Sequence, residues 1–113
     1  MEIHLIERTD DITHLALIGR LDVQGVQEID ARFAGYTSAR LRPAIVDLTH
    51  VDFVASLGMG MLLSNAAALE RSGVKMVLLN PQAMVEKVLR TVYVDRHLPI
   101  VRSEAEALAI FGS

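Results

Sequence analysis

The chain has 113 residues, no cysteine and a formal net charge of −3. This length fits one domain, 1–113, that buries its own core, and the lack of cysteine excludes disulfides, thiolate zinc sites and cysteine nucleophiles. Charges of both signs are scattered without a basic run, which argues against nucleic-acid binding. No signal peptide and no membrane-spanning apolar segment is recognisable. We therefore expect a cytoplasmic protein without membrane insertion.

Two strands are expected at the start of the chain, joined as an antiparallel hairpin. Apolar and polar residues alternate over 2–8, and a second apolar stretch covers 12–18. The sequence TDD at 9–11 supplies a turn between them. His4 and His14 fall within this hairpin, where we expect both side chains to face solvent.

Helices and strands are expected to alternate after the hairpin. Residues 22–35 carry apolar side chains every three or four positions, with Asp22 as the N-cap. Asn80-Pro81 opens a later helix as its cap and first turn, and Ser103 with Glu106 forms the capping box of the last helix, which ends near Phe111. The remaining expected elements are strands at 44–48, 74–79 and 98–101 and a helix at 57–71.

The resulting order, ββαβαβαβα, predicts an α/β fold with a small mixed sheet and covering helices. Pro99 places the strand at 98–101 at an edge of the sheet. The helix after Asn80-Pro81 is expected to bury an apolar face made of Met84, Val85, Val88, Leu89 and Val92. We also expect the methionines Met59, Met61 and Met84 to fill gaps in the core.

The most informative stretch is 44–63, in which an apolar strand leads through a turn into an apolar helix. The turn presents one hydroxyl, Ser56, at the helix N-terminus, where backbone N–H groups favour negative charge. Ser56 is expected to cap this helix, and a capping hydroxyl can also be phosphorylated. Gly58 and Gly60 either permit close packing on the sheet or shape a surface for a partner.

Catalytic chemistry has little support in the sequence. Ser56 lies in V-A-S-L-G rather than in G-x-S-x-G, and a pairing of Ser56 with His50 lacks an orienting acid. Metal-binding histidine spacings and nucleotide-binding glycine fingerprints do not occur. Asp47 and Asp52 flank the expected turn after 44–48, either as turn residues or as a metal or phosphate-transfer pair. We expect no catalytic residues, no cofactor and no metal.

Five segments, in this order, resemble the STAS family of anti-sigma factor antagonists. They are Gly19-Arg20-Leu21-Asp22, Val46 to Phe53, Ser56-x-Gly58-x-Gly60-x-Leu62-Leu63, Asn80-Pro81, and the Ser-Glu-Ala-Glu-Ala-Leu start of the last helix. The resemblance covers essentially the whole chain and implies a STAS-like fold. Bacterial members of the family bind an anti-sigma factor that is also a serine kinase. Binding frees the sigma factor, and phosphorylation by the kinase ends the interaction.

The resemblance also implies functional residues. The family's turn reads Asp-Ser-Ser/Thr-Gly, so its phosphorylated serine aligns with Ser56, and an aspartate near the same surface aligns with Asp22. The sequence departs from this pattern at Ala55, which removes an acceptor and a charge, and at Leu57, which places an apolar side chain beside the site. The implied partner-binding residues are Asp22, Ala55, Ser56, Leu57, Gly58 and Met59.

The leading hypothesis is a non-enzymatic anti-sigma factor antagonist that binds an anti-sigma factor kinase and is switched off by phosphorylation at Ser56. The departures at Ala55 and Leu57 keep open a role for Ser56 in capping alone. A second hypothesis is a STAS accessory subunit of a transporter or of a larger signalling assembly, without phosphorylation. A third is a hydrolase that uses Ser56 as its nucleophile.

Overall fold

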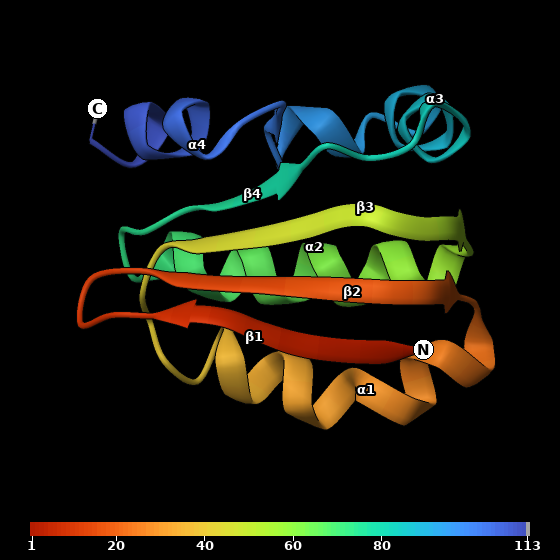
Figure 1. Ribbon diagram of the computed structural model, residues 1–113, viewed down its shortest axis with the longest axis horizontal. Coiled ribbons are helices and arrows are strands. Elements are labelled where there is room, and N and C mark those ends of the chain that lie inside the picture. Colours follow the sequence, from red (N-terminus) through yellow and green to blue (C-terminus); the bar gives the residue numbers. More distant parts are fainter. Residues whose placement is uncertain (113) are drawn as a thin grey trace.

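The computed structural model describes residues 1–112, apart from the side chain of Arg8, and is built around one five-stranded mixed sheet (Figure 1). The strand order is β1-β2-β3-β4-β5, which leaves β1 and β5 at the two edges. β1 pairs antiparallel with β2, and β3, β4 and β5 continue the sheet in parallel, so the expected mixed α/β fold is confirmed. The strands are β1 (Glu2–Arg8), β2 (Thr13–Leu21), β3 (Ala44–Val54), β4 (Met76–Leu79) and β5 (Ile100–Val101).

The helices cover both faces of the sheet unequally. They are α1 (Val23–Tyr36), α2 (Ser56–Arg71), α3 (Ala83–Thr91), the short 3-10 helix η1 (Val94–Arg96) and α4 (Glu104–Phe111). The larger core lies between the sheet and α1, α2 and α3, with Phe33, Leu62 and Leu89 fully buried. A smaller core on the opposite face packs Ile45 and Val77 against α4. Within residues 1–112, none of the helices has the length and apolarity needed to cross a membrane.

The third strand is much longer than the sequence pattern indicated. β3 continues to Val54 instead of ending at residue 48, because its parallel pairing with β2 persists as far as Leu21 opposite Val54. Asp47 and Asp52 therefore lie within the strand and do not flank a turn. Asp47 Oδ1 accepts hydrogen bonds from the backbone N–H of Thr49 at 2.9 Å and from its hydroxyl at 2.5 Å, so local hydrogen bonding explains this carboxylate.

β1 has the expected bounds, whereas three other strands begin or end at residues different from those expected. β2 continues to Leu21 rather than stopping at residue 18, because the ladder absorbs an irregularity at Gly19, whose φ is +116°. β4 starts two residues later than expected, at Met76, and β5 is confined to Ile100–Val101. Each boundary follows the partner strand, since a strand extends only as far as hydrogen bonding continues.

Two expected helix caps are wrong. α2 begins at Ser56 itself, so its N-cap is Ala55 and no side chain caps the helix. α3 begins three residues after Asn80, which adopts a left-handed φ of 52° and donates from Nδ2 to the Thr49 hydroxyl at 3.2 Å. Asn80 therefore ties the end of β4 to β3 and does not cap α3.

The other two expected caps are present. Asp22 caps α1, and its Oδ1 accepts from the backbone N–H of Gly25 at 2.7 Å. Ser103 caps α4, with its hydroxyl accepting from the N–H of Glu106 at 3.2 Å. The return bond of the box is shifted by one residue, because the Glu106 carboxylate accepts from the N–H of Arg102 at 2.6 Å.

The apolar face of α3 is only partly buried. Val85 and Leu89 are buried, whereas Met84 is 73% exposed and Val88 and Val92 are also exposed. The expected face was wider than the buried one because α3 contacts the sheet along a single narrow stripe. Of the other methionines, Met61 is buried and Met59 packs against the core from a half-buried position.

The two hairpin histidines differ in exposure. His4 is exposed as expected, but His14 is buried, which corrects the expectation of a solvent-facing position. His14 pairs with Ile45 of β3, and side chains paired across neighbouring strands lie on the same face of a sheet. His14 therefore belongs to the face that α4 covers.

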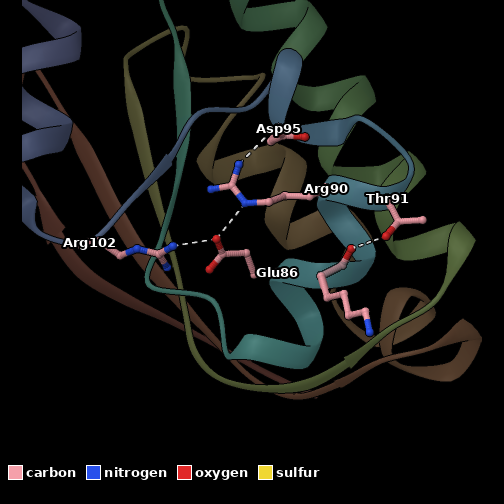
Figure 2. Close-up of polar contacts among 6 residues, drawn as sticks. Glu86, Arg90, Thr91, Asp95 and Arg102 are labelled. Atoms are coloured by element: carbon pink, nitrogen blue, oxygen red, sulfur yellow. Dashed lines mark hydrogen bonds and ion pairs between the residues drawn. The ribbon is translucent and has the colours of Figure 1, made fainter.

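A cluster of charged side chains joins α3 to the segments around it (Figure 2). The Glu86 carboxylate accepts from Arg90 Nε at 2.8 Å and from Arg102 Nη2 at 2.6 Å, and Arg90 also pairs with Asp95 of η1 at 3.0 Å. The hydrogen bonds from Arg102 and Arg90 lower the pKa of Glu86 to about 2. This cluster links α3 to η1 and to the connection between β5 and α4.

Candidate functional site

The parallel pairing of β2 with β3 brings the expected site residues to one edge of the sheet. Leu21 lies opposite Val54, and the backbone N–H of Ala55 donates to the Leu21 carbonyl at 2.9 Å. Asp22 and Ala55, the residues that follow these two strands, therefore emerge next to each other. This position is the carboxyl edge of parallel strands, where α/β folds place their binding sites.

Gly58 allows α2 to start directly against the end of β2. A Cβ atom at Gly58 would lie 2.6 Å from Cγ of Leu21 and 2.8 Å from its carbonyl oxygen. Gly60 differs, since a Cβ atom there would meet nothing within 4 Å. Of the two readings of the glycines, close packing therefore accounts for Gly58 and does not account for Gly60.

The six expected partner-binding residues have very different exposures. Ser56 is exposed and Leu57 is 48% exposed, so both side chains are accessible at the start of α2. Asp22, Ala55 and Met59 are half-buried, and Gly58 is buried. Gly58 therefore contributes to the surface indirectly, by letting the first turn of α2 pack closely against β2, and not through its own exposed atoms.

The Ser56 hydroxyl makes no hydrogen bond to the described residues, and it lies at a helix N-terminus, where the helix dipole favours negative charge. It has no hydrogen-bond partner among residues 1–112, and it is the first residue of a 16-residue helix whose first turn has no acidic side chain. The unpaired N–H groups of such a turn attract anions. The expected alternative of Ser56 as the N-cap is wrong, because Ala55 occupies that position.

Three further side chains at this edge were missed by the sequence reasoning. Val23 is 54% exposed and Phe53 is 39% exposed, directly after Asp22 and before Val54. Arg20 stacks on the Phe53 ring at 4.4 Å and lies 3.6 Å from the Asp22 carboxylate. Residues that flank the ends of two paired strands lie at the same edge of the sheet, so their positions in the sequence could have identified these three side chains. That inference requires the true end of β3, which the sequence pattern placed too early.

The structure does not assemble a nucleophilic site at Ser56. His50 lies within β3 and is exposed, and the described residues show no hydrogen bond between His50 and the Ser56 hydroxyl. A serine nucleophile depends on a base within hydrogen-bond reach.

Comparisons with known proteins give a consistent result. Residues 5–107 match the STAS domain family, while no curated protein sequence matches the chain significantly. A putative anti-sigma factor antagonist from Thermotoga maritima superposes with a TM-score of 0.84 at 19% identity, over 95% of this chain and 92% of that one. At such an identity the likeness concerns the fold alone.

Three further solved structures also superpose on this chain. The anti-sigma factor antagonist SpoIIAA in its unphosphorylated form gives a TM-score of 0.77 at 24% identity, over 99% of this chain and 98% of that one. The phosphorylated form of Bacillus SpoIIAA gives 0.66 at 25% identity, over 96% and 97%. The murine anion transporter Slc26a9 gives 0.75 at 18% identity, over 94% of this chain but 18% of the transporter. With its sheet order and with residues 5–107 matched, the chain belongs to the STAS domain family.

Proposed function

We propose that this protein is an anti-sigma factor antagonist that binds an anti-sigma factor and thereby frees a sigma factor. The observation that carries the proposal is the adjacency of Asp22 and the Ser56–Leu57 turn at the carboxyl edge of β2 and β3. The structural likeness to SpoIIAA, an anti-sigma factor antagonist, supports it. The protein acts by binding and performs no chemistry of its own.

The chemistry of the edge suits a protein partner. Val23, Phe53 and Leu57 supply exposed apolar area, and Arg20 and Asp22 supply a polar margin. An apolar centre with a polar rim is the usual composition of a specific interface. We therefore propose that the partner covers the first turns of α1 and α2.

Phosphorylation of Ser56 by the partner kinase is the proposed switch. A phosphate adds about −1.5 to −2 charges at neutral pH and needs compensating N–H groups or cations. The first turn of α2 provides N–H groups and no acidic side chain, so the domain tolerates the group. A partner packed on this turn is displaced by the added bulk and charge. The structure of Bacillus SpoIIAA in a phosphorylated form supports this proposal for the present chain.

Binding can be measured by titrating the cognate anti-sigma factor into purified variants in a calorimeter. We expect Ser56→Asp and Leu57→Ser each to weaken binding at least about tenfold, as for residues near an interface centre. Ser64→Asp is the matched control, because Ser64 is also exposed on α2 but lies two turns further along. Unchanged affinity in both Ser56→Asp and Leu57→Ser would exclude this edge as the interface.

Phosphorylation can be measured separately by intact mass after incubation with the cognate kinase and ATP. We expect a single added phosphate on the wild-type protein and on Ser64→Ala, and none on Ser56→Ala. A phosphate that persists on Ser56→Ala would place the modification elsewhere. Binding without any phosphorylation would leave the antagonist role intact and remove the switch.

The likeness to murine Slc26a9 favours one second candidate, an accessory STAS subunit of a transporter or signalling assembly. In that role the chain would bind a membrane or scaffold protein, and Ser56 would stay unmodified. Genes neighbouring the coding sequence separate the two candidates. A histidine-kinase-like ATPase and a sigma factor support the antagonist, and transporter components support the accessory subunit.

A further inference from the structure

Three potential metal ligands meet at the end of the sheet opposite the proposed docking edge, which is the edge formed by the carboxyl ends of β2 and β3. Glu7 of β1, His14 of β2 and Glu104 of α4 each offer one ligand atom, and these atoms all lie within 4.8 Å of one another. Glu7 and His14 are cross-strand partners in the hairpin, whereas Glu104 comes from the first turn of α4. Two carboxylates and an imidazole are thus gathered from elements that are distant in sequence.

His14 supplies a second, independent observation. Its side chain is only 9% exposed, and its Nε2 atom is buried without a hydrogen-bond partner among residues 1–112. Buried polar atoms are almost always paired, because leaving one unpaired costs about 1–3 kcal/mol. No other buried side-chain nitrogen or oxygen in the described part of the chain lacks a partner. A ligand for this nitrogen would remove the cost.

From this geometry we propose that Glu7, His14 and Glu104 bind a divalent transition-metal ion, with Zn²⁺ as the best fit. A neutral imidazole favours Zn²⁺ and its neighbours in the first transition row over Ca²⁺ or Mg²⁺, which prefer oxygen ligands. Tetrahedral zinc holds its ligand atoms about 3.4 Å apart, given bonds of about 2.1 Å. The ligand atoms lie within 4.8 Å of one another, and both glutamates are exposed, so metal binding requires their side chains to rotate toward this closer spacing. A water molecule supplies the fourth ligand.

Such an ion would fasten the N-terminal hairpin to α4. The pairing of β1 with β2 fixes the backbone positions of Glu7 and His14, and the cap at Ser103 fixes the backbone position of Glu104. These three residues are brought together only in the folded chain. Binding therefore stabilises the folded state in proportion to the logarithm of the free metal concentration. This inference is independent of the proposed function, since the site lies at the other end of β2.

The test is a titration of ZnCl₂ into the metal-free full chain, followed by calorimetry and by the thermal unfolding midpoint. We expect one Zn²⁺ per chain and an unfolding midpoint that rises with zinc concentration. Glu104→Gln and His14→Gln should each weaken binding on the order of a hundredfold, since even supporting residues of metal sites contribute 10–100-fold. Glu104 is exposed, so its variant tests the site without altering a buried position.

His4→Gln is the matched control. His4 is exposed on the same hairpin, and its Nε2 lies 3.5 Å from the Glu2 carboxylate, so it is the competing surface site. Wild-type affinity in His4→Gln, together with loss in Glu104→Gln, would support the proposal. Absence of zinc binding, or loss in His4→Gln with retention in Glu104→Gln, would overturn it. Saturation by Mg²⁺ at the same affinity would also overturn the assignment to a transition metal.

Discussion

At the scale of single residues, Gly58 decides how the docking edge is built. Because Gly58 has no side chain, the first turn of α2 packs directly against Leu21 at the end of β2. Ser56 and Leu57 therefore lie at the same edge of the sheet as Asp22. Gly60, two residues later, is open on the side where a Cβ atom would point. The two glycines look alike in the sequence and have different physical roles.

We expect Gly58→Ala to lower the free energy of unfolding by about 1–2 kcal/mol, because overpacking costs more than the gain in helix propensity. Gly60→Ala should raise it by up to about 1 kcal/mol through propensity alone. Urea denaturation of both variants checks the contrast. Equal effects of the two substitutions would show that Gly58 is not sterically required.

Gly58→Ala should also displace the start of α2 and weaken anti-sigma factor binding, whereas Gly60→Ala isolates the effect of helix propensity. Folded Gly58→Ala with unchanged affinity would indicate that the position of this turn does not matter to the partner.

At the scale of elements, Asp22 has two separable roles. One carboxylate oxygen accepts from the N–H of Gly25 and starts α1, while the other lies 3.6 Å from Arg20 at the docking edge. The cap needs only an acceptor, and the ion pair needs the charge. The two roles can therefore be separated by choosing the substitution.

We expect Asp22→Ala to cost about 1 kcal/mol of stability through loss of the cap. Asp22→Asn should stay within about 0.5 kcal/mol of the wild type, because asparagine caps equally well. Its lost charge should nevertheless weaken association with the anti-sigma factor and reduce the salt dependence of the on-rate. Stopped-flow binding at two salt concentrations measures this effect. An on-rate identical to wild type would remove Asp22 from the interface.

At the scale of the whole molecule, the Glu86 cluster connects the last third of the chain. Arg102 and Arg90 hold the Glu86 pKa at about 2, below its ordinary value of 4.5. A carboxyl group whose pKa is lower in the folded state stabilises the protein above the unfolded pKa. That stabilisation is lost as the pH falls from about 4.5 toward 2.

We expect Glu86→Gln to lower the free energy of unfolding at pH 7 by about 1 kcal/mol, after allowance for solvent screening. The wild type and the variant should converge in stability as the pH approaches 2. Glu70→Gln is the control, because Glu70 is exposed on α2 and makes no ion pair among residues 1–112. A constant difference between wild type and Glu86→Gln from pH 7 to pH 2 would contradict the assignment.

The sequence pattern, made of alternation, continuous apolar runs, helical spacing and cap motifs, identified every strand and the four longer helices, because burial of one or both faces leaves such patterns. It missed η1, which is too short to show a repeat, and it ended β3 too early. The second half of β3, THVDFV, mixes polar and apolar residues. It is held in the strand by pairing with β2, which local sequence does not encode.

The amino-acid sequence by itself determined the order of elements, the caps at Asp22 and Ser103, and the family resemblance carried by its short motifs. These properties depend on local hydrogen bonding and on hydrophobic repeats, so they are readable residue by residue. Only the tertiary structure decided that Ala55 takes the N-cap position of α2, that Val23 and Phe53 are exposed at the same edge as Ser56, and that His14 is buried near Glu7 and Glu104. Those properties depend on which strands pair and in what register, and that is a balance of burial over the whole chain.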